Sequence, residues 1–300
     1  MTVAVLYGGP SEERAISLNS GEAVAAALER RGHPVARIDA GRDLPERLRE
    51  AGAERAWVAL HGPFGEDGVV QGCLETLAIP YTGSGVLGSA LAMDKLRSKQ
   101  VWQAAAIPTP PMVDLGVEPV DTVAARLGWP VMVKPAASGS SLGMSRVDDA
   151  AGLEPARREA VALDDSVLAE AWVDGAEVTV GILAGEPLPV LRLKTARGFY
   201  DYTAKYDKGA GTEYLHPTGL GAEVEAHCQR LAVAAFEALA CRGWGRVDLM
   251  VGESGVQVIE VNTIPGMTEH SLVPKAAAHA GIGFDDLVER ILATAATAQG

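Results

Sequence analysis

The first sixty residues alternate apolar runs with helix-like stretches, and this order restricts the fold more than any other feature of the chain. Strand-like runs lie at 3–7, 35–39 and 56–60, and helices are expected between them at about 19–31 and 45–51. Strand, helix, strand order predicts a parallel, Rossmann-like α/β sheet, whose ligands lie beyond the carboxyl ends of the strands.

Polar loops follow two of the expected strands, at the edge of the sheet where ligands bind. Glu13, in the loop 8–14, could pair with a substrate ammonium group, and His61, which opens the loop 61–68, could orient that group or handle a proton. A plainer interpretation of Glu13 stays open, because an acidic residue at a helix entry also stabilises the helix dipole.

The stretch Gly83–Gly88 matches the dinucleotide pattern G-x-G-x-x-G, but its surroundings do not fit NAD binding. It follows a fourth strand-like segment, and no acidic residue closes a further strand about twenty residues later. We interpret it as a tight turn that opens a helix.

The rest of the chain continues with helices and strands. Helices are expected at 93–106, 120–127, 150–163, 223–240, 272–279 and 284–294, and strands at 131–134, 144–147, 167–173, 177–184 and 188–194. The segment 195–221 is long for a connection without regular structure, which favours a lid or a binding loop.

The loop 136–143 is rich in glycine and serine and follows a strand that ends at Lys134. Its backbone N–H groups and the hydroxyls of Ser140 and Ser141 are available without bulk, as close approach to phosphate oxygens requires. Lys134 would add a positive charge. The loop could equally be a flexible hairpin tip, because no Walker A pattern accompanies it.

Near the C-terminus, apolar runs at 247–251 and 256–261 flank Glu253-Ser254-Gly255, which predicts a β-hairpin with a three-residue connection. The predicted register sets Asp248 opposite Glu260 on one face of the hairpin.

The same register sets Arg246 opposite Asn262, on the face that carries the two carboxylates. Facing carboxylates repel unless a cation lies between them, and a set of oxygen ligands from Asp248, Glu260 and Asn262 suits Mg²⁺. Arg246 could hold developing negative charge beside the metal. A solvated, polar hairpin face is the alternative.

Composition excludes several classes of protein. The formal net charge of −13, without any run of Lys and Arg, argues against nucleic acid as a partner. No apolar run approaches the roughly 18 residues of a membrane span, and the chain starts on strand-like residues instead of a signal peptide. We therefore expect a cytoplasmic protein without a membrane partner. The cysteines at 73, 228 and 241 are few and widely spaced, so neither disulfides nor a zinc site is expected.

Several long motifs, spread over nearly the whole chain, resemble those of the D-alanine–D-alanine ligase family, a member of the ATP-grasp superfamily. They are LHGPFGEDG (60–68), PYTGSG (80–85), MDKLRSK (93–99), VKPAASGSSLGMS (133–145), FYDYTAKY (199–206), GWGRVDLM (243–250) and EVNTIPGMTEHSLVP (260–274). The resemblance implies an N-terminal Rossmann-like, substrate-binding domain (1–84) followed by a two-subdomain ATP-grasp fold, with a central part (85–172) and a C-terminal part (173–300).

The resemblance also implies an activity. Members of the family join two D-alanine molecules with ATP through an acyl phosphate, for peptidoglycan synthesis. We expect ATP, two Mg²⁺ or Mn²⁺ ions in each site, and a homodimer. Close alternatives are a ligase with D-lactate or D-serine as second substrate, or a nucleotide-binding module that has lost catalysis.

The residues that match the family's nucleotide and metal sites form one group. Asp248, Glu260 and Asn262 match the metal ligands; Lys95, Lys134 and Lys205 match phosphate contacts, with Ser140 and Ser141 on a phosphate lid; Glu170, Ala171 and Val173 match the adenine contacts and Glu177 the ribose contact. Two departures stand out. Ala171 replaces a lysine that is frequent in the family, and Ala137-Ser138 replaces a more charged pair.

The residues that match the family's D-alanine sites and reaction centre form a second group. Glu13 matches the carboxylate at the first ammonium, with His61 beside it; Ser271 and Leu272 match the site for the second carboxylate; Arg246 and the Gly266 N–H match the groups around the reacting carbon. Tyr206 is expected to face Ser140 and Glu13 and to shape the second pocket, as in members that form a dipeptide. No nucleophilic side chain is needed for this chemistry.

Overall fold

The computed structural model describes residues 1–139, 142–195 and 211–298. Its N-terminal part contains a parallel sheet in the order β2-β1-β3, which confirms the predicted α/β fold. The elements here are β1 (Val3–Tyr7), β2 (Val35–Asp39), β3 (Arg55–Val58), α1 (Arg14–Arg30), α2 (Leu44–Glu50) and α3 (Val69–Thr76). Residues Val3 to Leu6 are fully buried, because helices cover both faces of such a sheet.

Helix α1 begins at Arg14, earlier than the predicted start near Asn19. Its first turns bury Ser17, Ser20 and Gly21, so the buried face of the helix carries no apolar pattern there. A Cβ atom on Gly21 would lie only 2.3 Å from the Cβ of Tyr7. The helix therefore needs glycine at this position to pack closely on β1.

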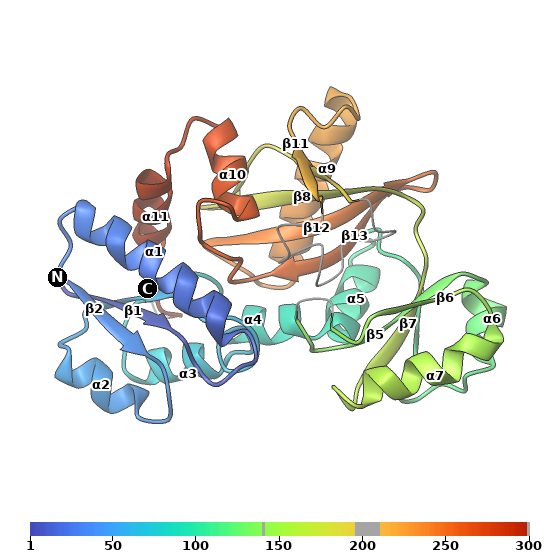
Figure 1. The fold of residues 1–300 in the computed structure, drawn as a ribbon, viewed down its shortest axis with the longest axis horizontal. Helices are drawn as coiled ribbons and strands as arrows, with labels where there is room; N and C mark the ends of the chain where they lie inside the picture. Colours follow the sequence, from blue (N-terminus) through green and yellow to red (C-terminus); the bar gives the residue numbers. More distant parts are fainter. Residues whose placement is uncertain (140–141, 196–210, 299–300) are drawn as a thin grey trace.

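The core of the first sheet is completed by the end of the chain. Helices α10 (Leu272–His279) and α11 (Phe284–Ala293) share a hydrophobic cluster with β1 and α1, and Figure 1 shows α11 beside α1. Arg30 pairs with Asp285 at 2.6 Å across this contact. The strand-like segment before Gly83 forms only isolated bridges, from Tyr81 to Ala56 and Ala296.

Helices α4 (Val86–Met93) and α5 (Lys95–Ala104) lead from the first sheet to the rest of the molecule (Figure 1). The glycine-rich stretch that resembles a dinucleotide motif is a turn that opens α4, as we expected. Gly88 packs there against a loop, since a Cβ atom would lie 2.6 Å from the Ala240 carbonyl oxygen.

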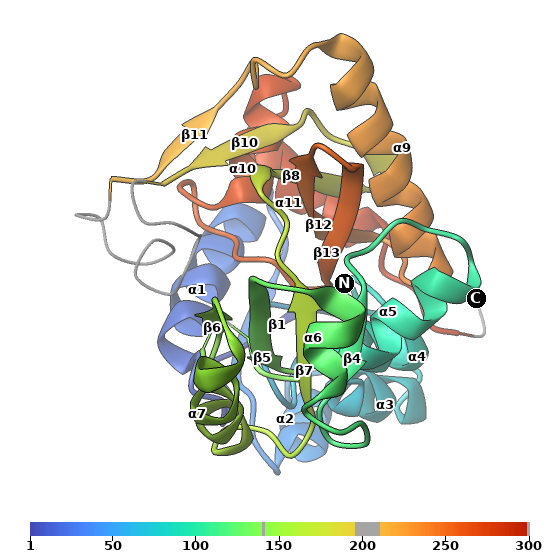
Figure 2. The ribbon, with the colours of Figure 1, turned by 90° about the vertical axis from the view of Figure 1, so that its right-hand side faces the viewer.

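The central part contains an antiparallel sheet in the order β4-β7-β5-β6. Its elements are β4 (Met112–Asp114), β5 (Val131–Pro135), β6 (Ser145–Val147), β7 (Val167–Ala171), α6 (Thr122–Leu127) and α7 (Ala150–Val161). Helices α6 and α7 pack on its outer face (Figure 2). The inner face is left to line a cavity.

The C-terminal part contains an antiparallel sheet in the order β11-β10-β8-β12-β13, with β9 paired to β8. Its elements are β8 (Gly175–Leu183), β9 (Glu186–Pro187), β10 (Leu191–Lys194), β11 (Glu213–Leu215), α9 (Ala222–Ala238), β12 (Trp244–Gly252) and β13 (Gly255–Asn262). Helix α9 covers one face of this sheet (Figure 2). The expected strand at 188–194 begins only at Leu191, and β11 lies inside the segment 195–221, for which no regular structure was expected. In the described part of the chain, none of the helices combines the length and the apolar character needed to cross a membrane.

Candidate active site

A cavity of 270 Å³ lies between the central and the C-terminal sheets. Strands β5 and β7 line it from one side, and strands β8, β10, β12 and β13 line it from the other. Among the predicted residues, Lys134, Glu170, Ala171, Val173, Glu177, Asp248 and Glu260 line this cavity. The two sheets therefore bring together residues that lie far apart in the sequence.

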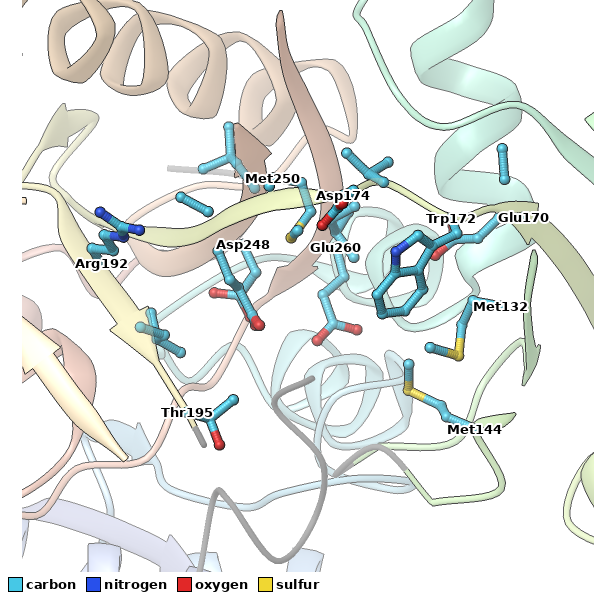
Figure 3. A pocket seen from close by; sticks show the side chains of 18 of the residues that line it. Met132, Met144, Glu170, Trp172, Asp174, Arg192, Thr195, Asp248, Met250 and Glu260 are labelled. Atoms are coloured by element: carbon cyan, nitrogen blue, oxygen red, sulfur yellow. The ribbon is translucent and has the colours of Figure 1, made fainter. Parts of the chain in front are cut away.

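One end of the cavity is apolar and flat. Figure 3 shows the Trp172 ring beside Met132 and Met144, and Met250 lines the cavity from β12. The guanidinium of Arg146 lies 4.7 Å from the centre of the Trp172 ring. Thioethers and an indole ring form a polarizable surface that suits a planar ring system.

A buried cluster of charges lies behind this end. Both Lys134 and Lys99 pair with the carboxylate of Glu170, Lys99 at 2.8 Å, and both lysine side chains are almost fully buried. Burial lowers the pKa of Lys99 to about 8, since the positive charge of Lys134 adds to the effect and the attraction of Glu170 offsets only part of it. Burial alone would raise the pKa of Glu170, but the two lysines outweigh it and lower that pKa.

Lys99 was not among the predicted site residues. Its signal was present in the sequence, because Lys95 and Lys99 are four residues apart on α5 and therefore share a face of the helix. Lys95 itself donates to the Ser138 carbonyl oxygen at 2.9 Å and lies 3.6 Å from Glu260.

The facing carboxylates are confirmed. Asp248 of β12 pairs with Glu260 of β13, Arg246 pairs with Asn262, and Figure 3 shows both carboxylates pointing into the same space. The turn was predicted wrongly, since Gly252 pairs with Gly255 and the connection is two residues long. A bulge between Asp248 and Leu249 shifts the register back by one residue.

Asp248 is held by several donors. Arg246 binds it with two nitrogens, Nε at 2.9 Å from Oδ1 and Nη2 at 2.8 Å from Oδ2. Thr179 Oγ1 donates to Oδ1 at 2.6 Å, and Asn262 Nδ2 lies 3.1 Å from Oδ2. The hairpin thus carries two carboxylates, one amide and one guanidinium on a single face.

The loops of the first sheet reach the same region. A Cβ atom on Gly62 or Gly139 would lie 2.7 or 2.9 Å from Glu13 Oε2, so the Glu13 carboxylate lies against both the loop after β3 and the glycine-serine loop. A second, smaller cavity of 40 Å³ is lined by Glu66, Lys95, Ser138 and Glu260 among others. This cavity thus lies between the loop after β3, which contributes Glu66, and the end of β13, which contributes Glu260.

His61 has a different environment from the one expected for a group that handles a substrate proton. It is buried, its Nδ1 lies 2.8 Å from the Ile264 carbonyl oxygen, and its Nε2 lies 3.2 Å from Ser20 Oγ. Burial lowers the pKa of His61, which favours the neutral ring. Both ring nitrogens thus have partners within the protein.

Glu66, also missed from the sequence, accepts the N–H groups of Gly62 at 2.8 Å and Ile264 at 3.2 Å. Desolvation raises the pKa of Glu66 to about 8, and the negative charge of Glu13 adds to this. Glu66 lies within the conspicuous loop motif 60–68 that contains His61, and this motif was the available signal.

The pKa of Glu66 predicts how stability changes with pH. Its pKa in the folded state, about 8, lies above the ordinary value of 4.5, so the folded chain keeps this proton while the unfolded chain loses it. The resulting stabilisation is complete below pH 4.5 and is lost as the pH rises through 8. Relative to Glu66→Gln, we expect the free energy of unfolding of the natural chain to fall between pH 5 and 8, by at most about 1.4 kcal/mol per pH unit. Urea unfolding of both chains at these pH values measures the difference, and a constant difference would contradict the prediction.

Three further predicted residues lie between the end of β13 and the start of α10. Ser271 precedes α10 and Leu272 is its first residue, and a Cβ atom on Gly266 would lie 3.1 Å from Ser271 Oγ. Gly266 therefore lies directly against the expected second-substrate site. Ser140, Ser141, Lys205 and Tyr206 lie outside the described residues.

Two antiparallel sheets that face each other across a cavity, with buried lysines on one side and carboxylates on the other, define the ATP-grasp class of fold. Family models described as D-ala D-ala ligase N-terminus and C-terminus match residues 40–84 and 101–293. The chain belongs to the D-alanine–D-alanine ligase family.

Individual relatives agree with this assignment. A D-alanine–D-alanine ligase of Nitrosococcus oceani is 52% identical over 297 residues, which cover 97% of this chain and 93% of the relative. One of Halorhodospira halophila is 53% identical over 98% of this chain and 95% of the relative. The crystal structure of D-alanine–D-alanine ligase from Bacillus anthracis has a TM-score of 0.88 at 37% identity and covers 98% of this chain and 97% of that one. The same enzyme complexed with ATP has a TM-score of 0.85 at 33% identity, with the same coverage.

Proposed function

We propose that this chain joins two D-alanine molecules to D-alanyl-D-alanine and converts ATP to ADP and phosphate. The observation that carries the proposal is the pair of Asp248 and Glu260, which faces the buried lysine cluster across one cavity. Membership of the family supports the same conclusion. The dipeptide serves peptidoglycan synthesis in this family, and the use of ATP favours the cytoplasm as the place of reaction.

In this proposal ATP binds in the cavity between the two sheets, with its base at the apolar end. In this proposal the base lies near Trp172 and the methionines, with Glu170, Ala171 and Val173 as its edge contacts and Glu177 at the ribose. Lys95 and Lys134 bind the phosphates, and Ser140, Ser141 and Lys205 add contacts from the loops. Ala171 has no charged side chain to offer, so its contact runs through the backbone.

The carboxylate face fits divalent cations. Asp248, Glu260 and Asn262 offer hard oxygen ligands, which Mg²⁺ or Mn²⁺ prefers, and Figure 3 shows that both carboxylates are directed at the same space. Two such ions, when bound, would neutralise charge on the transferred phosphoryl group. Arg246 and Lys95 already lie next to the carboxylates and supply positive charge of their own.

The reaction then has two steps. A carboxylate oxygen of the first D-alanine attacks the γ-phosphorus, the new O–P bond forms, and the bond from phosphorus to ADP breaks. Glu13 holds the ammonium group of this D-alanine. The protein contributes position and charge, with no covalent intermediate on a side chain.

In the second step the amine of the other D-alanine, after loss of a proton to solvent, attacks the acyl carbon. The C–N bond forms, the C–O bond to phosphate breaks, and phosphate leaves with the second proton of the nitrogen. Arg246 and the Gly266 N–H stabilise the tetrahedral oxyanion. Ser271 and the Leu272 N–H bind the second carboxylate at the start of α10, where the helix dipole favours negative charge, and Tyr206 shapes this pocket.

We also propose that the chain divides into three functional parts, at about residues 84 and 172.

We propose further that the chain forms a homodimer. Val69, Val86 and Leu87 are exposed apolar side chains (54%, 43% and 61%), and Gly68 lies against Val86, so these side chains gather on one surface. Sedimentation of the natural chain and of Leu87→Asp tests the dimer: a monomer in the first sample would contradict it.

The buried lysine cluster predicts a specific effect on ATP binding. Lys99→Met leaves Glu170 with Lys134 alone, so Lys134 has less positive charge to offer a phosphate. We expect the KM for ATP to rise about tenfold, as for the loss of a charged hydrogen bond, with kcat little changed. In the natural chain, the KM for ATP should rise as the pH passes about 8, where Lys99 loses its proton, and Lys99→Met should lack this rise.

Lys194→Met is the matched control, because Lys194 lines the same cavity but is 64% exposed. It should change the KM for ATP less than about threefold. Equal KM values for Lys99→Met and the natural chain would show that the cluster does not contribute to nucleotide binding.

The proposed function is tested by offering ATP and Mg²⁺ with D-alanine alone, L-alanine alone, or D-alanine together with D-lactate, measuring phosphate and identifying products by mass. We expect phosphate and D-alanyl-D-alanine only with D-alanine. An ester with D-lactate as the main product would identify another second substrate, and ATP binding without any phosphate release would identify a binding module.

A further inference from the structure

The segment from Ile264 to Met267, which lies in the connection from β13 to α10, is anchored on the N-terminal domain by its backbone. The Ile264 N–H donates to Glu66 Oε1 at 3.2 Å, and the Ile264 carbonyl oxygen lies 2.8 Å from His61 Nδ1. Both side chains come from the loop after β3. They therefore hold the two polar groups of one residue, just before Gly266.

The other end of the segment is anchored from α1. The Met267 N–H donates to Ser20 Oγ at 3.1 Å, and Ser20 Oγ lies 3.2 Å from His61 Nε2. Ser20 and Met267 are fully buried. The backbone is thus fixed on both sides of Gly266 by residues far away in the sequence.

The backbone groups at the two ends of this network, the Ile264 carbonyl oxygen and the Met267 N–H, determine which side-chain atoms donate and which accept. A carbonyl oxygen only accepts, so His61 Nδ1 must carry the proton and Nε2 must accept. The Ser20 hydroxyl then donates to Nε2 and accepts the Met267 N–H. Every member is satisfied only with a neutral His61, and such connected buried networks specify one arrangement of the backbone.

Close packing also restricts the movement of the segment 264–267. The Ile264 side chain is 3% exposed and lies in the same hydrophobic cluster as β1 and α1. Gly266 is close to Ser271, since a Cβ atom would lie 3.1 Å from its hydroxyl oxygen. A shift of the segment would therefore change the place of the Gly266 peptide relative to the second-substrate site.

We propose that Ser20, His61 and Glu66 are positioning residues that hold the Gly266 peptide in place for attack by the second amine. The inference rests on the proposed function, because it concerns the second of its two steps. It gives the N-terminal domain a part in forming the peptide bond, besides binding the first D-alanine. It also gives His61 a structural task in place of proton transfer.

The two steps can be measured separately. Exchange of ¹⁸O in ATP, from the β-nonbridging to the β,γ-bridging position in the presence of D-alanine, reports reversible formation of the acyl phosphate. Dipeptide formation reports both steps together. Displacement of Gly266 should lower the rate of dipeptide formation and leave the rate of ¹⁸O exchange unchanged.

The variants are Ser20→Ala and Glu66→Gln in the full chain, with Ser17→Ala as the matched control. Ser17 lies on the same helix, is equally buried, and donates to the Ala59 carbonyl oxygen at 2.7 Å without contacting the 264–267 segment. We expect both variants to lower kcat for the dipeptide about tenfold, the effect of one lost hydrogen bond, and to change the exchange rate less than about twofold. Ser17→Ala should leave both rates within about twofold of the natural chain.

Equal losses of exchange and ligation in both variants, or no loss of ligation in either, would overturn the proposal. Melting temperatures identify a variant that does not fold, and the other variant then decides. Absence of D-alanine-dependent exchange in the natural chain would instead contradict the proposed function, so the two failures are distinguishable.

Discussion

Glu260→Gln should lose at least about a hundredfold in kcat while the chain keeps its fold. The substitution keeps the shape of the side chain and removes one negative charge from the pair with Asp248, which the register of β12 and β13 sets face to face. With one carboxylate left, the face binds Mg²⁺ less tightly and neutralises less of the charge on the phosphoryl group. Phosphate release at increasing Mg²⁺ measures the effect, and thermal melting checks the fold.

Glu253→Gln is the matched control, because Glu253 lies in the exposed turn of the same hairpin and outside the cavity. It removes the same charge and should leave kcat unchanged within about twofold. Near-normal turnover of Glu260→Gln at saturating Mg²⁺ would contradict the metal assignment.

Arg246→Met should also reduce kcat about a hundredfold, with the KM for ATP changed less than about threefold. Arg246 holds Asp248 with two nitrogens and is proposed to meet the oxyanion of the second step, and its own side chain is not among those that line the cavity proposed for ATP. Steady-state rates of dipeptide formation measure both parameters. Arg246→Lys keeps the charge but lacks the planar fork, so it should recover only part of the activity.

Arg242→Met provides the comparison for Arg246. Arg242 precedes β12, lies 5.1 Å from the Tyr81 ring centre and donates to the Ala296 carbonyl oxygen at 2.8 Å, away from the cavity. Loss of the Arg242 side chain should lower the melting temperature clearly and kcat only slightly. A normal kcat in Arg246→Met would remove this side chain from the transition state.

The facing of Asp248 and Glu260 could be predicted from strand alternation, although the predicted turn was one residue too long. A two-residue turn shifts the register by one residue, and the bulge between Asp248 and Leu249, which leaves Ile259 of β13 outside the register, shifts it back. The burial pattern shows the change of phase: Val256 and Val258 are buried, and then Val261. Two consecutive apolar residues, Val258 and Ile259, were the only sign of it in the sequence.

Other features were hidden because their cause is tertiary. Ser17, Ser20 and Gly21 form the buried face of α1 without an apolar pattern, since the helix packs closely on Tyr7 and its serines reach distant backbone groups. Lys99 and Glu66 lie in motifs that the sequence shows, but their burial was hidden, because charged side chains are usually exposed. Their partners, Glu170 and Ile264, come from parts of the chain far away from them.

Formation of an acyl phosphate can be tested by following oxygen from D-alanine to phosphate. With D-alanine labelled by ¹⁸O at both carboxylate oxygens, the reaction through an acyl phosphate must transfer one labelled oxygen to each phosphate released. We expect singly labelled phosphate in equal amount to ADP and D-alanyl-D-alanine. Unlabelled phosphate, or label in AMP with release of pyrophosphate, would contradict this expectation.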